Sequence, residues 1–123
     1  MSYKIQQDCA RSMLILRCSD VVDREELEKA REELVRTANQ DEIQHVLVDL
    51  RHTYLALSSY DQVEFSGSNH KHLPFGTDLA ILIDADDPDI QEYETIETAG
   101  MDRGLDLLVF TDQKEAEKWL RAS

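Results

Sequence analysis

Short apolar runs separated by charged and polar segments set the pattern of this chain. Met13–Leu16, Val46–Leu50 and Leu79–Ile83 are apolar at almost every position, which is typical of strands buried on both faces of a sheet. The first two predicted strands are expected to be joined by a turn over residues 8–11. The predicted strands are Tyr3–Gln7, Ser12–Cys18, Gln44–Leu50, Thr77–Ile83 and Leu105–Phe110.

The segment Arg24–Asn39 has helical periodicity. Its apolar positions recur three and four residues apart, and most other positions are charged, as on a solvated helix face. Asp23 can cap this helix, and Glu26 stands three residues on, which completes a capping-box pattern. The buried stripe is expected to comprise Leu27, Ala30, Leu34, Val35 and Ala38.

Three further helices are predicted after it. A weaker one covers Tyr60 to about Asn69, and another begins at Asp87–Pro88, an N-cap followed by a proline in the first helical position. That helix is expected to end near Gly104. The last helix opens at Thr111 or Asp112. Its inward face is expected to comprise Ala116, Trp119 and Leu120.

These elements follow one another in the order β-β-α-β-α-β-α-β-α. Regular alternation after the first two strands predicts right-handed crossovers and a sheet covered by helices. We therefore predict an α/β sandwich with a mostly parallel central sheet of about five strands and four helices. All of residues 1–123 are expected to form a single domain.

The charge balance narrows the class of partner. The chain has 26 acidic and 13 basic residues, a formal net charge of −13. Such a surface repels phosphate backbones and anionic lipid headgroups, so nucleic acid is not expected as a partner. A basic protein or basic patch is the more natural one, although solubility alone would also explain the charge.

The protein is expected to lie in the cytoplasm, with its cysteines reduced. No apolar run approaches the roughly 20 residues that span a bilayer, so no membrane insertion is expected. The N-terminus has no signal-peptide pattern. Cys9 and Cys18 are near the first two strands and could face each other, but a buried structural thiol is favoured for each.

Paired serines, Ser58 and Ser59, stand at the predicted start of the second helix. Either hydroxyl can cap the helix, and Ser59 with Gln62 fits a capping box. The alternative is phosphorylation, which would add nearly two negative charges where the orphan amides of a helix start can hold them. Capping is the favoured interpretation on spacing alone.

The rest of the sequence shows no recognisable group of catalytic or metal-binding residues. The aspartates of residues 84–89 follow a strand end, but a helix start at Asp87–Pro88 explains them more simply than a cation site. His70-Lys71-His72 lacks further ligands at zinc spacing, and neither serine is in a Gly-x-Ser-x-Gly elbow. We expect no cofactor, no metal and no enzymatic activity.

Two segments carry a resemblance to a known family. Val46–His52 with Ser58-Ser59 is similar to the strand, Asp-Leu, loop and Ser-Ser pattern of the STAS domain. Arg103–Asp112 with Glu115–Leu120 resembles the ending of the SpoIIAA-like (STAS/SEC14) group. The resemblance spans nearly the whole chain. It implies the fold of anti-sigma-factor antagonists and no enzymatic chemistry.

The resemblance also implies a site. In such antagonists the second serine is phosphorylated by a partner kinase that is also an anti-sigma factor, which corresponds to Ser59 here. The acidic residue and the glycine that flank the pair in the family are Leu57 and Tyr60 in this chain.

The leading hypothesis is a regulatory module that docks a protein partner, with self-association as a homodimer through the same surface as a further option. Exposed aromatic, arginine and large apolar side chains favour interfaces. The docking candidates are Arg51, Tyr54, Leu55, Leu57 and Tyr60. The alternative is a SEC14-like domain that holds an apolar ligand or lipid tail between helices and sheet, with the second helix and its Gly67 as a lid.

Overall fold

The structure, a computed structural model, describes residues 3–8, 12–58, 60–61, 64, 77–86 and 106–122. The helices among these residues are α1 (Arg24–Asp41) and α5 (Gln113–Ala122). The strands are β1 (Tyr3–Asp8), β2 (Met13–Cys18), β3 (Asp20–Asp23), β4 (His45–Asp49), β5 (Thr53–Ala56), β6 (Asp78–Leu82) and β7 (Asp106–Phe110).

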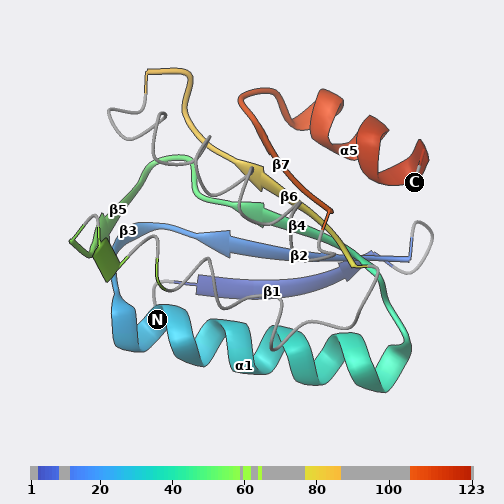
Figure 1. Cartoon of the computed structure of the whole chain (residues 1–123), viewed down its shortest axis with the longest axis horizontal. Helices are drawn as coiled ribbons and strands as arrows, with labels where there is room; N and C mark the ends of the chain where they lie inside the picture. The colour runs from blue at the N-terminus through green and yellow to red at the C-terminus, as the bar shows by residue number, and fades with distance from the viewer. Residues whose placement is uncertain are drawn as a thin grey trace.

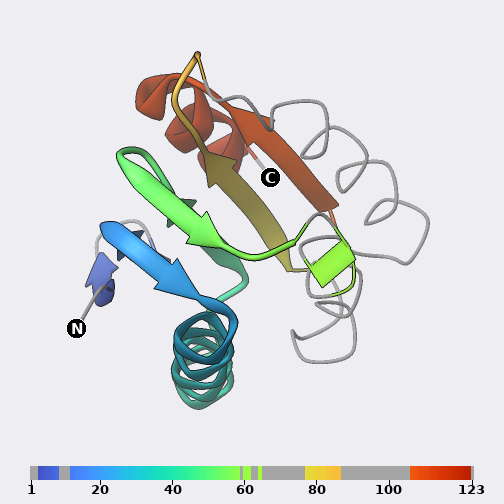
Figure 2. The ribbon, with the colours of Figure 1, turned by 90° about the vertical axis from the view of Figure 1, so that its left-hand side faces the viewer.

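Five strands form one sheet in the order β1-β2-β4-β6-β7. β1 runs antiparallel to β2, whereas β2–β4, β4–β6 and β6–β7 are parallel pairs. Helix α1 packs across one face of this sheet and α5 across the other (Figures 1 and 2). The carboxyl ends of the parallel strands therefore meet at one edge.

The alternation of side chains in the central strands explains why both faces need a helix. In β2, Leu14 and Leu16 belong to the core on the α1 side, while Met13 and Ile15 belong to the core on the α5 side. β6 is buried at every position. A strand that is apolar on both faces is stable only where both faces are removed from water.

The predicted fold class needs two corrections. The sequence predicts a mostly parallel sheet, but the sheet is mixed, because the β1–β2 hairpin adds an antiparallel edge to three parallel pairings. The described residues contain two bounded helices and not four. Of the predicted helix over residues 60–69, Tyr60, Asp61 and Glu64 have helical backbone, and the rest lies outside the described residues. The whole helix predicted from Asp87 to about Gly104 also lies outside them.

The sequence analysis missed two strands, β3 and β5, which form a separate parallel two-stranded sheet. Each has only four residues, and β3 has a single buried side chain, Val22. So short a strand carries almost no periodicity. Asp20, with a φ of 58°, turns the chain between β2 and β3, and its left-handed backbone is favoured at Asp and Asn over most other residues.

Both ends of α1 are capped by hydrogen bonds. The Asp23 carboxylate accepts a hydrogen bond from the backbone N–H of Glu26 at 2.8 Å, as the sequence predicted. At the other end Glu42 is left-handed, with a φ of 54°, and its N–H and that of Ile43 donate to the carbonyl of Ala38. The helix runs two residues past its predicted end at Asn39.

The predicted burial of Cys18 is confirmed, and its thiol is free. Burial, with the nearby carboxylates of Asp49 and Glu26, raises the pKa of the Cys18 thiol to about 11. The thiolate is thus scarce at neutral pH, as expected of a structural cysteine. Cys9 lies outside the described residues.

The Asp23 cap gives a direct test of the start of α1. Asp23→Ala removes the acceptor for the Glu26 amide and should lower the free energy of unfolding by about 1 kcal/mol. Urea unfolding followed by circular dichroism measures the change. Asp23→Ser, which keeps a capping oxygen, is the matched control. Equal losses for the two variants would contradict a capping role.

Candidate functional site

A group of polar residues lies past the carboxyl ends of the parallel strands. Asp49 ends β4, and the following turn of Leu50–His52 leads into β5 (Figure 1). Asp84 follows β6, and Asp112 precedes α5. The strand ends bring these residues to one edge, where open α/β folds commonly place their sites.

Asp49 is the centre of this edge, and its buried carboxylate accepts four hydrogen bonds. Oδ1 accepts from the backbone N–H and the Nε of Arg51, each at 3.1 Å. Oδ2 accepts from Nη2 of Arg51 and from Nη1 of Arg17, each at 3.0 Å. The bidentate pairing of guanidinium and carboxylate is the strongest geometry such a pair adopts.

These contacts decide the charge state of Asp49. Burial acts to raise its pKa, but the hydrogen bonds from the side chain and backbone of Arg51, and the positive charges of Arg51 and Arg17, outweigh it. The pKa of Asp49 therefore lies below its ordinary value. The carboxylate stays ionised, and its oxygens are occupied by hydrogen bonds from within the protein.

Arg51 also connects the sheet edge to α5. Its Nη2 donates to Oε1 of Gln113 at 2.9 Å. The next residue, His52, is left-handed with a φ of 60°, and its N–H donates to a carboxylate oxygen of Asp84 at 2.9 Å. The turn after β4 is thereby fixed to both neighbouring elements.

The segment after this turn presents alternate side chains to solvent. Tyr54 is 69% exposed and Tyr60 is 75% exposed. Leu55 and Leu57 are half-buried and pack against the core on the α1 side. Of the five docking candidates, the two tyrosines thus face solvent, the two leucines anchor the segment, and Arg51 is held by Asp49.

Ser58 caps the helical turn that follows. Its Oγ accepts a hydrogen bond from the backbone N–H of Asp61 at 3.1 Å, the contact of an N-cap residue with the third helical position. Ser58 is exposed. Ser59 and Gln62, the predicted capping-box pair, lie outside the described residues.

Arg24 holds this turn against the start of α1. Its guanidinium donates to Glu28 at 3.0 Å, to Asp61 at 2.8 Å and to Glu64 at 2.8 Å. A hydrogen bond to Glu64 raises the pKa of the Tyr60 phenol, and the contact with Arg24 lowers the pKa of Glu64. Sequence reasoning missed this clamp, because nothing near Arg24 marks partners about forty positions away.

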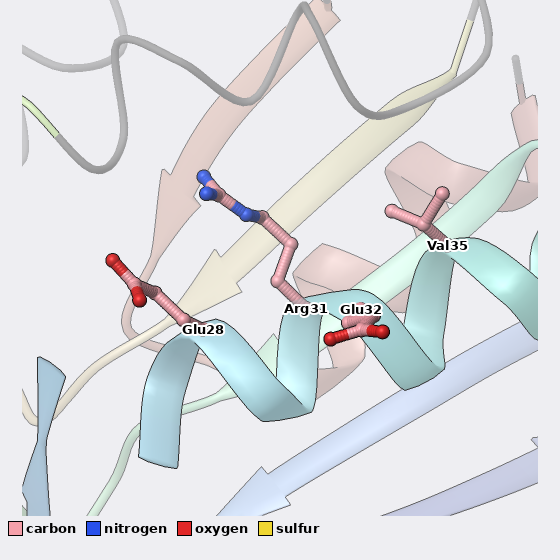
Figure 3. Close-up of a pocket in the computed structure, with 4 residues that line it drawn as sticks. All are labelled: Glu28, Arg31, Glu32 and Val35. Atoms are coloured by element: carbon pink, nitrogen blue, oxygen red, sulfur yellow. The ribbon is translucent and has the colours of Figure 1, made fainter. Parts of the chain in front are cut away.

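Two of the hollows on the described part of the chain are lined mostly by residues with charged or polar side chains. One, of about 580 Å³, is bounded by α5 and the turn after β4. Its lining comprises Arg51, Thr111, Asp112, Gln113, Lys114 and Glu117. The other, of about 300 Å³, lies on α1 and is lined by Glu28, Arg31, Glu32 and Val35 (Figure 3).

The aspartate and histidine segments considered as metal ligands form no metal site within the described part of the chain. No group of three or more His, Cys, Asp or Glu side chains is arranged there so that it could hold a metal ion. Asp84 and Asp86 are described, whereas Asp87, Asp89 and the His70–His72 segment lie outside. Neither described helix is long and apolar enough to cross a membrane.

Comparison with known proteins identifies the fold. No protein-family model and no curated protein matches the sequence. The anti-sigma factor antagonist SpoIIAA in its unphosphorylated form superposes with a TM-score of 0.66 and 11% identity, covering 98% of this chain and 99% of that one. The chain has a SpoIIAA-like fold. The resemblance drawn from the sequence is thus confirmed at the level of the fold.

Two further SpoIIAA-like structures agree. An anti-sigma factor antagonist from Mycobacterium paratuberculosis has a TM-score of 0.62 and 13% identity, with 97% of this chain and 92% of that chain covered. The phosphorylated form of SpoIIAA from Bacillus has a TM-score of 0.61 and 14% identity, with 96% and 98% covered. At such identities the likeness establishes the fold alone.

The Asp49 contacts predict how stability depends on pH. Because the folded-state pKa is depressed, the contribution of Asp49 is complete above its unfolded-state pKa of about 3.9 and is lost as the pH falls through the lower folded value. Asp49→Asn should therefore lower the free energy of unfolding by about 2 kcal/mol at pH 7 and by much less near pH 2.5.

Denaturant unfolding between pH 2.5 and pH 7 measures this difference. Asp41→Asn, which neutralises an exposed carboxylate at the end of α1, is the control and should show little change at either pH. A penalty for Asp49→Asn that is constant across the pH range would refute the ionic account of this site.

Proposed function

We propose that this protein is a non-enzymatic regulatory module of STAS type that binds a protein partner through the Arg51–Tyr60 segment. The observation that carries the proposal is the pair of exposed tyrosines, Tyr54 and Tyr60, on either side of the Ser58 cap. They stand on a SpoIIAA-like fold, and the solved structures that share it include anti-sigma factor antagonists.

The burial of the segment supports this role. A docking surface needs side chains that are free to contact a partner and a rigid support that holds them in place. Tyr54 and Tyr60 meet the first need. Leu55 and Leu57, half-buried on the core, and Arg51, fixed by Asp49, meet the second. We assign Arg51, Leu55 and Leu57 to the support of this surface.

Phosphorylation at the Ser58-Ser59 helix start would switch such a surface. Ser58 is exposed, so its hydroxyl is accessible to a kinase. A phosphate there would add negative charge within the capping turn, beside the carboxylates of Asp61 and Glu64 that share Arg24. By analogy with the family that the sequence resembles, the proposed acceptor is Ser59, and the proposed partner is a kinase that is also an anti-sigma factor.

The alternative, a binder of a small apolar ligand or lipid tail, has less support. An apolar ligand needs a pocket with a mainly apolar lining. The two hollows described above are lined mainly by residues with charged or polar side chains, with Val35 as the apolar exception. We further propose that the chain forms a single domain and is located in the cytoplasm. Homodimer formation through the docking surface would compete with binding of the protein partner.

The docking role predicts a strong effect at the exposed rings. Tyr54→Ala or Tyr60→Ala should weaken binding of the natural partner, recovered by affinity purification from the native host, by about tenfold or more. Surface plasmon resonance measures the change. Tyr54→Phe keeps the ring and should bind nearly as well. Unchanged affinity in both alanine variants, with circular dichroism showing an intact fold, would contradict the docking role.

The switch predicts a modification that can be mapped. Peptide mapping by mass spectrometry of the protein from its native host, grown under several conditions, should locate a phosphate on Ser59 or Ser58. An unmodified peptide under every condition would leave Ser58 as a helix cap alone. The docking role would then stand without the switch.

A further inference from the structure

The two-stranded sheet carries an outward-facing apolar pair. Val21 of β3 lies directly opposite Tyr54 of β5 in the parallel register, and they are 55% and 69% exposed. The next pair in the register, Val22 and Leu55, faces the core. Neighbouring strands lie about 4.8 Å apart, so Val21 and Tyr54 form one continuous surface.

Tyr60 belongs to the helical turn that follows β5. Arg24, the first residue of α1, follows β3 directly and binds Asp61, the neighbour of Tyr60. The helical turn is therefore held beside the two-stranded sheet. Val21, Tyr54 and Tyr60 are the large hydrophobic residues that are exposed in the described part of the chain. We name these three residues the apolar patch.

Single exposed apolar residues are ordinary on protein surfaces, but clustered ones mark contact sites. All three members of the apolar patch belong to the chain around β3 and β5, at one end of the main sheet (Figure 1). This clustering is independent of the family resemblance, which does not involve Val21.

The surroundings of the patch are acidic. Asp20 and Asp23, which flank the valines of β3, are both exposed. Among the described residues, Arg24 contacts three carboxylates, which leaves an excess of negative charge there, and Arg51 is held by Asp49. In α1, Glu25 is 78% exposed, and its contact with Lys29 at 3.5 Å is long and solvated.

We infer that the apolar patch and its acidic rim receive a basic segment of the partner, in which lysine or arginine residues flank a large apolar side chain. The inference rests on the docking role proposed above and adds Val21 and the charge of the partner to it. The apolar side chain would bury against Val21 and Tyr54, and the cations would meet the rim. Opposite charges of this kind select partners and accelerate their association.

Site-specific photocrosslinking in the native host tests the chemistry of the partner. The photoreactive amino acid p-benzoyl-phenylalanine is placed at position 54, where a large exposed ring already stands, and for comparison at position 118, which is exposed on α5. Mass spectrometry then sequences the crosslinked peptide. The expected result is a partner peptide rich in lysine and arginine from position 54 only.

The other outcomes separate the two proposals. A neutral or acidic partner peptide at position 54, or a peptide from a second copy of this chain, overturns the basic-segment inference and leaves the docking surface in place. Crosslinks from position 118 without any from position 54 overturn the docking surface as well.

Charge substitutions on the rim give the second test. Asp20→Asn with Glu25→Gln should weaken binding of the crosslinked partner by about fivefold at low salt, and less at high salt. Asp41→Asn with Glu115→Gln removes the same charge from exposed positions outside the rim and is the matched control. Equal effects of the two pairs would show that only net charge matters and would overturn the local rim.

Discussion

Burial of the central strands on both faces is the constraint from which the rest of this structure follows. β2, β4 and β6 place apolar side chains toward α1 and toward α5 alternately, so neither face can be left to water. Polar side chains are then excluded from most of the strand length. They collect where the strands end, which is why Asp49, Asp84 and Asp112 share one edge.

Asp49 shows the cost of placing a charge at that edge. A buried carboxylate is tolerated only when its lone pairs are occupied by strong donors, and here two arginines and a backbone amide supply them. The same contacts hold the Arg51 guanidinium in place, although its side chain is still 32% exposed. Arg51, a docking candidate from the sequence, thus fixes the turn that leads into β5.

The Arg24 clamp links the Ser58 turn to the rest of the molecule through charge. Three carboxylates, those of Glu28, Asp61 and Glu64, share one guanidinium, so this part of the surface is negative before any modification. A further negative group near Ser58 would compete with Asp61 and Glu64 for Arg24. The position of the turn and the charge of the surface are thus parts of one arrangement.

The sequence by itself determined the features that depend on neighbouring residues. The five strands of the main sheet, helix α1 with its Asp23 cap, helix α5 and the burial of Cys18 follow from local periodicity, capping chemistry and apolar content. The likeness of its motifs to SpoIIAA-like proteins also indicated the correct fold.

Only the tertiary structure decided which residues distant in sequence meet. The β3–β5 pairing, the contact of Arg17 with Asp49 across 32 positions and the clamp of Arg24 on Asp61 and Glu64 have no local signal. Exposure of Val21 and Tyr54 beside the burial of Val22 and Leu55 depends on the same pairing. The physical reason is that a four-residue strand is too short to show a hydrophobic period, and an ion pair leaves no pattern in the residues around either partner. In both cases the packing of the folded chain decides which residues meet.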